Sequence, residues 1–554
     1  MKNTSENSYF FLLVSFVGAA LLAGPPAYAQ DKTAEVDKIF SWTKPNEPGC
    51  AVAVSQNGKL FVNKAYGSAD LERDVPLSTN SVFDAGSVRK QFVAAAILLL
   101  VEEGKLSLSD DVRKHIPQLP DYGHKITVDH LLTHTSGIRD WQPLLNLAGG
   151  DPDAMTMILR QRELNFAPGE EWSYSNSGYV LLPEIVARVS GMPFSEFARK
   201  RLFEPLGMKM MTYVDDPLYL IKNRALAYKK EASGWKMDMY LGNDRGGAGS
   251  LFTTAVDLVT WNDALTANRL GAFVTQKLQE PTVLNNGRKL SYARGLQLEP
   301  FRGGGQLVWH SGGAAGYSAL VGRLPEQGLS VAITCNADGS ARSAYAGRIF
   351  DLFLPPGSIQ DNPRSANAGG LGAPPGDLSG KAGLFFDENT GQPLRLAVNN
   401  NTLMIAGGGP LVTLAADRFK NQRSSLSFMS EAEFELQFLS ADQFEIKTKD
   451  GVTTRYRRAV GYTPTADDLK AFAGRYYSGE LMAVFEATPG KDGLMVRAND
   501  APRALLEFKP VARDTFQIGG SLLRFTRDKA GKLVGLQYSN PLLRNVKFTR
   551  LGDR

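Results

Sequence analysis

The sequence predicts an α/β domain built on a five-stranded antiparallel sheet flanked by helices, followed by two small antiparallel β-barrel domains. Three observations support this prediction. Short strand-like segments alternate with helical segments from Gly49 to about Leu354. A segment rich in Pro, Gly, Ser and Asn follows at residues 354–376, and the remaining chain carries one β-rich pattern twice. At roughly 150 residues per domain, a chain of 554 residues holds three or four domains, which agrees with this division.

Both ends of the first domain supply strands to the predicted sheet. At its beginning, strands over residues 50–55 and 59–65 flank Asn57-Gly58, a dipeptide typical of a β-hairpin. Near its end, three more strands are expected at residues 306–309, 317–324 and 329–335. The helical middle of the domain is therefore bracketed by its own sheet. We place this domain at residues 30–356 and a linker at residues 357–375.

The C-terminal part of the chain contains an internal repeat. Asp377-Leu378 begins a pattern that recurs at Asp468-Leu469, and Leu403-Met404 recurs as Leu494-Met495 at the same offset of 91 residues (377 to 468, 403 to 494). Each copy has several short strands with turn residues at intervals of about 8 to 12. We therefore expect one small barrel at residues 376–460 and another at residues 461–554.

The composition is that of an ordinary globular protein, with 43% hydrophobic and 21% charged residues, which excludes disordered and fibrous classes. The net charge of +5 comes with no basic run, so we expect no nucleic acid partner. Two cysteines and five histidines leave little material for a metal site. We expect no metal and no other cofactor.

The first 29 residues have the pattern of a secretory signal peptide. Lys2 precedes an apolar run over residues 9–24, and the small-residue triplet Ala27-Tyr28-Ala29 follows. We expect cleavage after Ala29 and a periplasmic or secreted protein that is not integral to the membrane. An uncleaved membrane anchor is the alternative interpretation, although the run is barely long enough to span a bilayer.

Ser87 and Lys90 are the first candidate catalytic residues. They lie three positions apart at the start of an apolar helical run over residues 92–101, so the Lys90 amine can reach the Ser87 hydroxyl and take its proton. A helix N-terminus stabilises negative charge, and the Ser87 N–H can donate to an oxyanion. The competing interpretation is a capped helix start with a solvated lysine.

Two further elements carry groups of the same chemistry. Tyr174 offers a phenol for proton transfer, and Asn176 offers an amide that can hold a substrate carbonyl or the lysine. His310 follows a strand and precedes Gly312 and Gly313, where a substrate can lie against the strand edge. We expect the Gly313 N–H to complete the oxyanion hole. For His310 alone, a histidine with purely structural hydrogen bonds is the competing interpretation.

Together these elements, in this order and spacing, resemble the penicillin-recognising serine hydrolases of the class C β-lactamase type. Residues 126–137 and 248–258 look like two further hallmarks of that family, so the resemblance covers about residues 38–354. It implies the β-lactamase/transpeptidase-like fold and an acyl-Ser87 intermediate. It also implies that Lys90 and Tyr174 share the role of base, that His310 assists Tyr174, and that Asn176 holds the acylated chain.

The third element distinguishes branches of this family. It begins with His310 where the β-lactamases have a lysine, which resembles the D-alanyl-D-alanine carboxypeptidases and the D-aminopeptidases. In the D-aminopeptidase branch two barrels also follow the catalytic domain, and the last barrel sends a loop toward the cleft. The candidate turns for such a loop here are residues 488–493 and 499–501.

The expected activity is therefore that of an exported serine peptidase on short peptides or amides that contain D-amino acids. A carboxylesterase or a weak β-lactamase on the same site is the closest alternative, because acyl-enzyme chemistry does not specify the leaving group. A further alternative, of a different functional class, is a penicillin sensor that deacylates very slowly or a cell-wall binding protein. The oligomeric state is not legible in the sequence.

Two remaining pairs of residues have open interpretations. His130 and His134 are spaced as zinc ligands on a helix can be, but no third ligand is suitably placed, so we expect this segment to shape the rim of the site. Cys50 and Cys335 lie on strands that are neighbours in the family that the chain resembles. A disulfide and two buried free thiols are both compatible with that placement.

Overall fold

The structure is a computed structural model. It describes residues 27–552 apart from 151, 217–218, 240–248, 302–303, 338–341, 355–376, 407–408, 422–433, 449–451 and 499–504. The apolar run of the expected signal peptide and the whole of the expected linker therefore lie outside the described residues. The first helix, α1 (Ala27–Ile39), begins before the expected cleavage position at Ala29.

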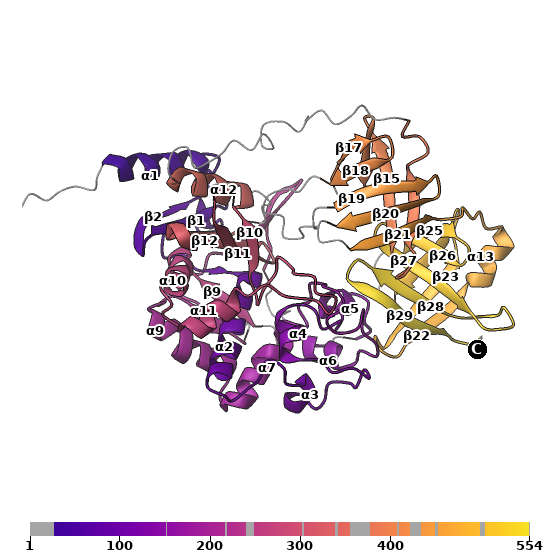
Figure 1. The fold of residues 1–554 in the computed structure, drawn as a ribbon, viewed down its shortest axis with the longest axis horizontal. Coiled ribbons are helices and arrows are strands. Elements are labelled where there is room, and N and C mark those ends of the chain that lie inside the picture. Colours follow the sequence, from indigo (N-terminus) through magenta and orange to yellow (C-terminus); the bar gives the residue numbers. More distant parts are fainter. Residues whose placement is uncertain are drawn as a thin grey trace, which may run out of the picture.

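A six-stranded antiparallel sheet forms the centre of the first domain (Figure 1). The strands, in spatial order, are β10 (Gln297–Pro300), β11 (Gln306–Ala314), β12 (Tyr317–Leu324), β13 (Leu329–Cys335), β1 (Cys50–Gln56) and β2 (Lys59–Tyr66). All five predicted strands are present, and β10 adds a sixth at the edge. The two ends of the domain meet where β1 pairs with β13.

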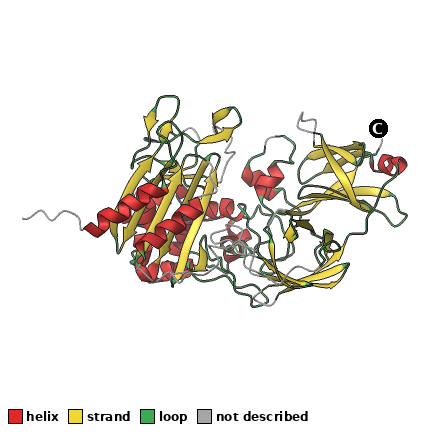
Figure 2. Ribbon diagram, turned by 90° about the horizontal axis from the view of Figure 1, so that it is seen from above, coloured by secondary structure: helices red, strands yellow, loops and turns green. Residues whose placement is uncertain are grey.

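Helices cover both faces of this sheet (Figure 2). On one face lie α1 and α12 (Arg342–Phe353), which pack against each other; α12 packs against β12 and β13, and α1 packs against β2. The opposite face carries α2 (Lys90–Glu102), α10 (Ala255–Thr266) and α11 (Ala272–Leu278). The chain buries a continuous apolar core on each side, because the inward positions of all the long strands are hydrophobic.

Shorter elements complete the domain. The helices are α3 (Val112–His115), α4 (Val128–Leu132), α5 (Trp141–Leu145), α6 (Ala154–Leu159), α7 (Gly178–Ser190), α8 (Phe194–Ala198) and α9 (Glu204–Leu206), with helical turns η1 (Gly86–Arg89), η2 (Arg199–Phe203) and η3 (Pro325–Gln327). The strands are β3 (Ser68–Asp70), β4 (Val75–Pro76), β5 (Phe83–Asp84), β6 (Thr212–Val214), β7 (Tyr228–Glu231), β8 (Gly234–Met237) and β9 (Ser250–Thr253).

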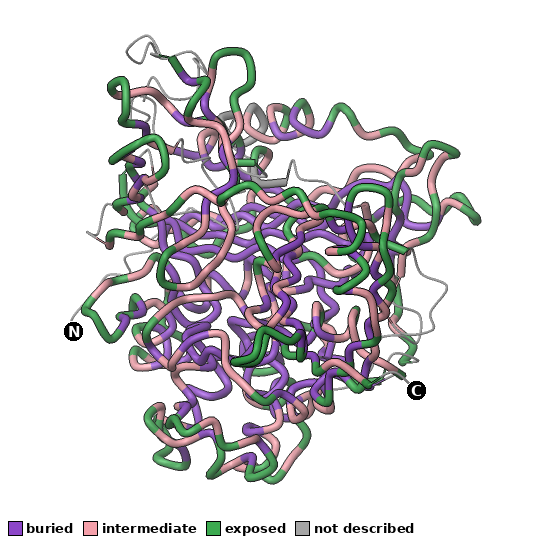
Figure 3. Tube along the Cα trace, turned by 90° about the vertical axis from the view of Figure 1, so that its right-hand side faces the viewer, coloured by how far each residue is buried: buried purple, intermediate pink, exposed green. Residues whose placement is uncertain are grey.

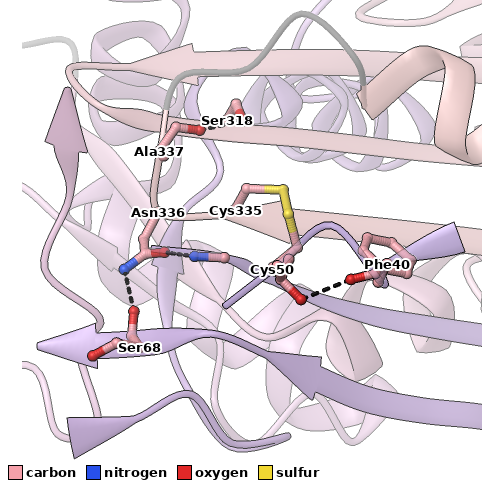
Figure 4. The surroundings of a disulfide bond; sticks show 9 residues. Phe40, Cys50, Ser68, Ser318, Cys335, Asn336 and Ala337 are labelled. Atoms are coloured by element: carbon pink, nitrogen blue, oxygen red, sulfur yellow. Dashed lines mark hydrogen bonds between the residues drawn. A yellow bond between two sulfur atoms is a disulfide. The ribbon is translucent and has the colours of Figure 1, made fainter. Parts of the chain in front are cut away.

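Cys50 and Cys335 form a disulfide, which decides between the two interpretations that the sequence leaves open (Figure 4). The two residues are directly opposite each other in the pairing of β1 with β13. Beside the bond, the Asn336 side chain accepts from the Gly49 N–H at 2.8 Å and donates to the Ser68 carbonyl at 2.9 Å. The first and last strands of the domain are thus joined both covalently and by hydrogen bonds.

The C-terminal part forms two eight-stranded β-barrels, as the repeat predicts. The first is nearly closed and contains β14 (Gly383–Asp387), β15 (Pro393–Asn399), β16 (Thr402–Ile405), β17 (Leu411–Ala415), β18 (Arg418–Asn421), β19 (Phe434–Ser440), β20 (Gln443–Thr448) and β21 (Thr453–Arg458). Its apolar interior is a core of its own.

The second barrel is closed. It contains β22 (Gly474–Ser478), β23 (Ala483–Pro489), β24 (Leu494–Ala498), β25 (Leu506–Ala512), β26 (Thr515–Ile518), β27 (Ser521–Arg527), β28 (Leu533–Asn540) and β29 (Leu543–Arg550), preceded by α13 (Ala466–Phe472). Figure 3 marks the buried residues along the chain in purple. Those of the second barrel belong to the same core cluster as those of the first domain. Among the described helices, none is long and apolar enough to cross a bilayer.

Candidate active site

Ser87 lies at the start of a helix, as the sequence predicts. It belongs to the turn η1, which continues directly into α2. The strand β5 positions this turn, because it pairs with β9 and the Ala85 N–H donates to the Leu251 carbonyl at 2.8 Å. The Asp84 carboxylate then accepts from the Gly86 N–H at 2.8 Å, which fixes the direction in which the chain enters η1.

Glycines allow the backbone of η1 to touch strand β11. Gly86 has a φ of 52°, and a Cβ there would lie 2.6 Å from the Gly313 nitrogen. A Cβ on Gly312 would lie 1.9 Å from the Ala85 carbonyl oxygen and 2.9 Å from the Ser87 nitrogen. Gly312 is therefore required for packing, whereas the Cβ position of Gly313 is almost open. The structure brings Ser87 and Gly313 together, as an oxyanion hole requires.

The Ser87 hydroxyl lies between the lysine and the tyrosine. Lys90 Nζ is 3.0 Å from Ser87 Oγ, and the Tyr174 hydroxyl donates to the same Oγ at 2.8 Å. The lysine also lies 4.6 Å from the centre of the Tyr174 ring. These three side chains come from two segments that are 87 residues apart, so the fold brings together the first and second predicted elements.

Burial shifts the pKa values of Lys90 and Tyr174 in opposite directions. Lys90 is 0% exposed, and this burial lowers its pKa well below 10.5. Burial raises the pKa of Tyr174, so its phenol keeps its proton. A neutral amine accepts a proton and a protonated phenol donates one. The geometry thus favours Lys90 as the base and Tyr174 as a proton donor, rather than two groups that share one role.

Asn176 contacts the lysine, which is one of its two predicted roles. Its side-chain carbonyl accepts from Lys90 Nζ at 2.8 Å. Its amide donates to Asp140 and to Gln142, each at 2.9 Å, and its backbone N–H donates to Asp140 at 2.8 Å. Asp140 is buried at the N-cap of α5 and raises the pKa of Lys90 by its charge. Sequence analysis did not identify Asp140 or Gln142, because no spacing relates either of them to Lys90.

His310 is buried in strand β11, two residues before Gly312. Its Nε2 lies 3.1 Å from the Tyr292 hydroxyl, and its Nδ1 lies 2.6 Å from the Ser311 carbonyl oxygen. Burial lowers its pKa to about 3. Its nitrogens are thus engaged by structural partners, which is the competing interpretation given above for this residue.

A family model described as Beta-lactamase matches residues 36–353, a range that contains Ser87, Lys90, Tyr174, Asn176 and His310. The chain belongs to the beta-lactamase family.

Two similar proteins differ in how much of this chain they cover. Penicillin-binding protein 4* of Bacillus subtilis is 30% identical over 294 residues, which are 49% of this chain and 64% of the relative. The D-aminopeptidase of Brucella melitensis is 25% identical over 544 residues, or 91% of this chain and 96% of the relative. The chain therefore spans just under two thirds of the penicillin-binding protein but almost all of the D-aminopeptidase, barrels included.

Two solved structures share the fold. The octameric penicillin-binding protein homologue from Pyrococcus abyssi has a TM-score of 0.52 and 23% identity, covering 77% of this chain and 99% of that one. The crystal structure of SurE has a TM-score of 0.51 and 19% identity, covering 95% of this chain and 99% of that one. At this level of identity, both support the beta-lactamase fold alone.

The two histidines of residues 126–137 have other partners than a metal. His130 Nδ1 accepts from the Thr127 N–H at 3.2 Å and so caps helix α4. His134 is buried beneath Tyr174, with ring centres 4.4 Å apart, and therefore lies under the site rather than at its rim. Within the described ranges, no three His, Cys, Asp or Glu side chains converge as a metal site would require.

The second barrel contacts the beta-lactamase domain through a loop that sequence analysis did not identify. The hairpin tip between β22 and β23 carries Glu480, which forms a buried ion pair with Arg139 at 2.8 Å. Arg139 directly precedes Asp140, so the barrel reaches the segment that holds Asn176. Of the two candidate turns, residues 488–493 bond within their own barrel and residues 499–501 lie outside the described part of the chain.

Proposed function

We propose that the chain is an exported serine hydrolase that works through an acyl-Ser87 intermediate and cleaves short peptides or amides that contain D-amino acids. The observation that carries this proposal is the Ser87 hydroxyl held between a buried lysine at 3.0 Å and a tyrosine at 2.8 Å. The similarity to D-aminopeptidases across 91% of the chain supports the substrate class. The division into residues 30–356, 376–460 and 461–554 is part of the same proposal.

Lys90 is the base in the first step of the proposed reaction. Its neutral amine takes the Ser87 proton while Oγ attacks the substrate carbonyl carbon and forms a C–O bond. The Ser87 and Gly313 N–H groups face the oxygen that becomes negative. Asn176 holds the lysine by accepting one of its N–H groups, which directs the nitrogen lone pair toward the serine.

Tyr174 supports the collapse of the tetrahedral intermediate. As the C–N bond breaks, the leaving nitrogen takes a proton from the phenol, and the Lys90 ammonium returns a proton to the phenol. Water then attacks the acyl-serine with the same groups acting in reverse order. His310 contributes no proton in this scheme, because its nitrogens are bonded to Tyr292 and Ser311.

Mass spectrometry and turnover together test this proposal. The mature protein is incubated with a fluorophosphonate and, separately, with benzylpenicillin, and its intact mass is measured. Turnover is then compared on D-alanine p-nitroanilide, L-alanine p-nitroanilide and p-nitrophenyl acetate. A fluorophosphonate adduct that is absent from Ser87→Ala, with hydrolysis of the D-anilide over the L-anilide, is the expected result. Ester turnover alone identifies a carboxylesterase, and no adduct refutes the assignment of Ser87.

The acid limb of the pH profile reports on Lys90. Catalysis requires the neutral amine, so kcat/KM falls as the pH drops through the lowered pKa of Lys90. Because this pKa lies well below 10.5, the protein keeps its activity far below the pH at which a solvated lysine becomes charged. Lys90→Arg, which stays charged, is expected to lose about a hundredfold or more in kcat. A limb near pH 10 in the unmodified protein would contradict the role of Lys90.

A further inference from the structure

Three buried side chains form a line of hydrogen bonds behind the candidate active site. His134 Nε2 lies 3.1 Å from the Tyr292 hydroxyl, which in turn lies 3.1 Å from His310 Nε2. All three residues are buried. We call His134, Tyr292 and His310 the buried triad. It connects residues from the segment after α4, the segment before β10, and strand β11.

The groups at the two ends fix the direction of every hydrogen bond in the buried triad. At one end, the Ser175 N–H can only donate, and it donates to His134 Nδ1 at 3.2 Å. The proton of this ring is therefore on Nε2, which donates to the Tyr292 oxygen. At the other end, the Ser311 carbonyl can only accept, so His310 carries its proton on Nδ1 and accepts on Nε2.

Only one orientation of the Tyr292 hydroxyl satisfies both histidines. It accepts from His134 and donates its single proton to His310. The two histidines are thus neutral and of opposite tautomer. Their burial agrees with this state, since it lowers the pKa of both rings. A second proton on His134 would point its Nδ1–H at the Ser175 N–H, which is also a donor. A second proton on His310 would face the Tyr292 hydroxyl, which already donates to that nitrogen.

His134 holds the backbone on both sides of Tyr174. The Ser173 N–H donates to the His134 carbonyl at 3.0 Å, and the Ser175 N–H donates to its ring. The His134 and Tyr174 rings also pack against each other, with centres 4.4 Å apart and planes inclined by 43°. His134 has a φ of 60°, which is strained for a residue with a Cβ and persists only where surrounding contacts hold it.

We infer that Tyr292 and the two histidines are positioning residues, which set the place of the Tyr174 hydroxyl relative to Ser87 by tying the Tyr174 loop to strand β11. Strand β11 also carries Gly313, so the buried triad holds the proton donor and the oxyanion site in one rigid unit. This inference rests on the proposed function for its effect on turnover. It assigns His310 to positioning, where the family resemblance implies assistance in proton transfer.

Tyr292→Phe is the most direct test, because it removes one hydroxyl and keeps the ring. It leaves the facing nitrogens of both histidines without a partner, and the Tyr174 loop loses its tie to β11. We expect kcat on the substrate of the native protein to fall about tenfold to a hundredfold, with KM within about twofold, since misplacement of a catalytic group affects the chemical step. Tyr476→Phe is the matched control: it removes a buried hydroxyl that donates to the Phe472 carbonyl at 2.7 Å in the second barrel.

A glutamine at position 310 separates positioning from proton transfer. Its side-chain oxygen accepts and its amide donates, as the inferred tautomer of His310 does, but it cannot take up or release a proton at neutral pH. His310→Gln should therefore keep at least about a third of kcat, whereas His310→Leu should lose as much as Tyr292→Phe. Equal loss in His310→Gln and His310→Leu, or unchanged kcat in folded Tyr292→Phe, would overturn the inference.

The tautomers can be measured without any substrate. Nitrogen NMR of protein with labelled histidines distinguishes the protonated nitrogen from the bare one in each ring. We expect one buried histidine with its proton on Nε2 and another with its proton on Nδ1, both unchanged between pH 5 and 8, and both perturbed in Tyr292→Phe. Titration of either ring in that interval would refute the buried triad. If the tautomers are found but the protein hydrolyses no substrate, the proposed function fails and the hydrogen-bond chain stands.

Discussion

The first hairpin of each barrel lies at the same position in the two repeats, yet its tip has different neighbours. In the second barrel, the tip at residues 479–482 buries Glu480 and Leu481 against the catalytic domain, where Glu480 pairs with Arg139 and the Leu481 carbonyl accepts from the Gly149 N–H at 3.0 Å. In the first barrel, the tip at residues 388–392 faces the second barrel, whose Arg524 donates to the Gly391 carbonyl at 3.1 Å. Figure 1 shows the resulting arrangement, with the second barrel beside α5 and α6.

The two tips also differ in the kind of contact that they make. Between described residues, every hydrogen bond from a barrel to the catalytic domain comes from the second barrel. Leu481 is completely buried in a core that the barrel and the catalytic domain share, whereas the first barrel encloses a separate core. The comparison shows that equivalent hairpins of the two repeats make different contacts: one contacts the neighbouring barrel, and the other buries two residues against the catalytic domain.

Removing the buried carboxylate is expected to have the largest effect. Glu480→Ala leaves the Arg139 guanidinium, which is 1% exposed on its side chain, without its closest carboxylate, and should lower the free energy of unfolding by about 3–5 kcal/mol. Urea denaturation measures this difference. Glu388→Ala, in the first-barrel tip, breaks only a partly exposed pair with Arg457 and should cost at most about 1 kcal/mol. Equal losses would mean that the two tips do not differ as described.

Truncation of Leu481, the apolar side chain of the second-barrel tip, is expected to lower the free energy of unfolding slightly less. Leu481→Ala creates a cavity in the shared core and should cost about 2–5 kcal/mol, depending on how far the site collapses. Its counterpart in the repeat, Thr390, is only half-buried, so Thr390→Ala should change stability by about 0.5 kcal/mol or less. Thermal unfolding of the two variants in parallel gives the comparison. A small loss for Leu481→Ala would show that polar contacts, such as the Glu480–Arg139 and Arg544–Glu171 pairs, hold the second barrel.

The contact between the barrels is expected to have the smallest effect. Arg524→Ala removes the hydrogen bond to Gly391 and the contact with Phe386, at 5.9 Å from the ring centre, and should cost about 1 kcal/mol. Because the first barrel has its own core, we expect calorimetry to show two transitions, of which only that of the first barrel moves in this variant. A single transition that shifts as a whole would indicate that all three domains unfold together.

Local sequence patterns account for the parts of the fold that could be predicted. The strands follow from alternating hydrophobicity and turn residues, and the two barrels follow from a repeat that the structure places in equivalent strands: Gly383 begins β14 and Gly474 begins β22. The edge strand β10 was missed, because four residues that include Pro300 carry too little pattern. The anchor loop was missed because Ser478 to Met482 has no turn signature stronger than that of residues 488–493.

The sequence by itself determined the family, the repeat and the pair formed by Ser87 and Lys90, because each depends on spacing along the chain and the side chains are near neighbours on one helical turn. Only the tertiary structure decided the roles of Asp140, Tyr292 and Glu480. Their partners are distant in the chain, as Arg139 and Glu480 are, at a sequence separation of 341. Hydrogen-bond direction and pKa also depend on burial, which is why we propose Lys90 rather than Tyr174 as the base and assign His310 to positioning.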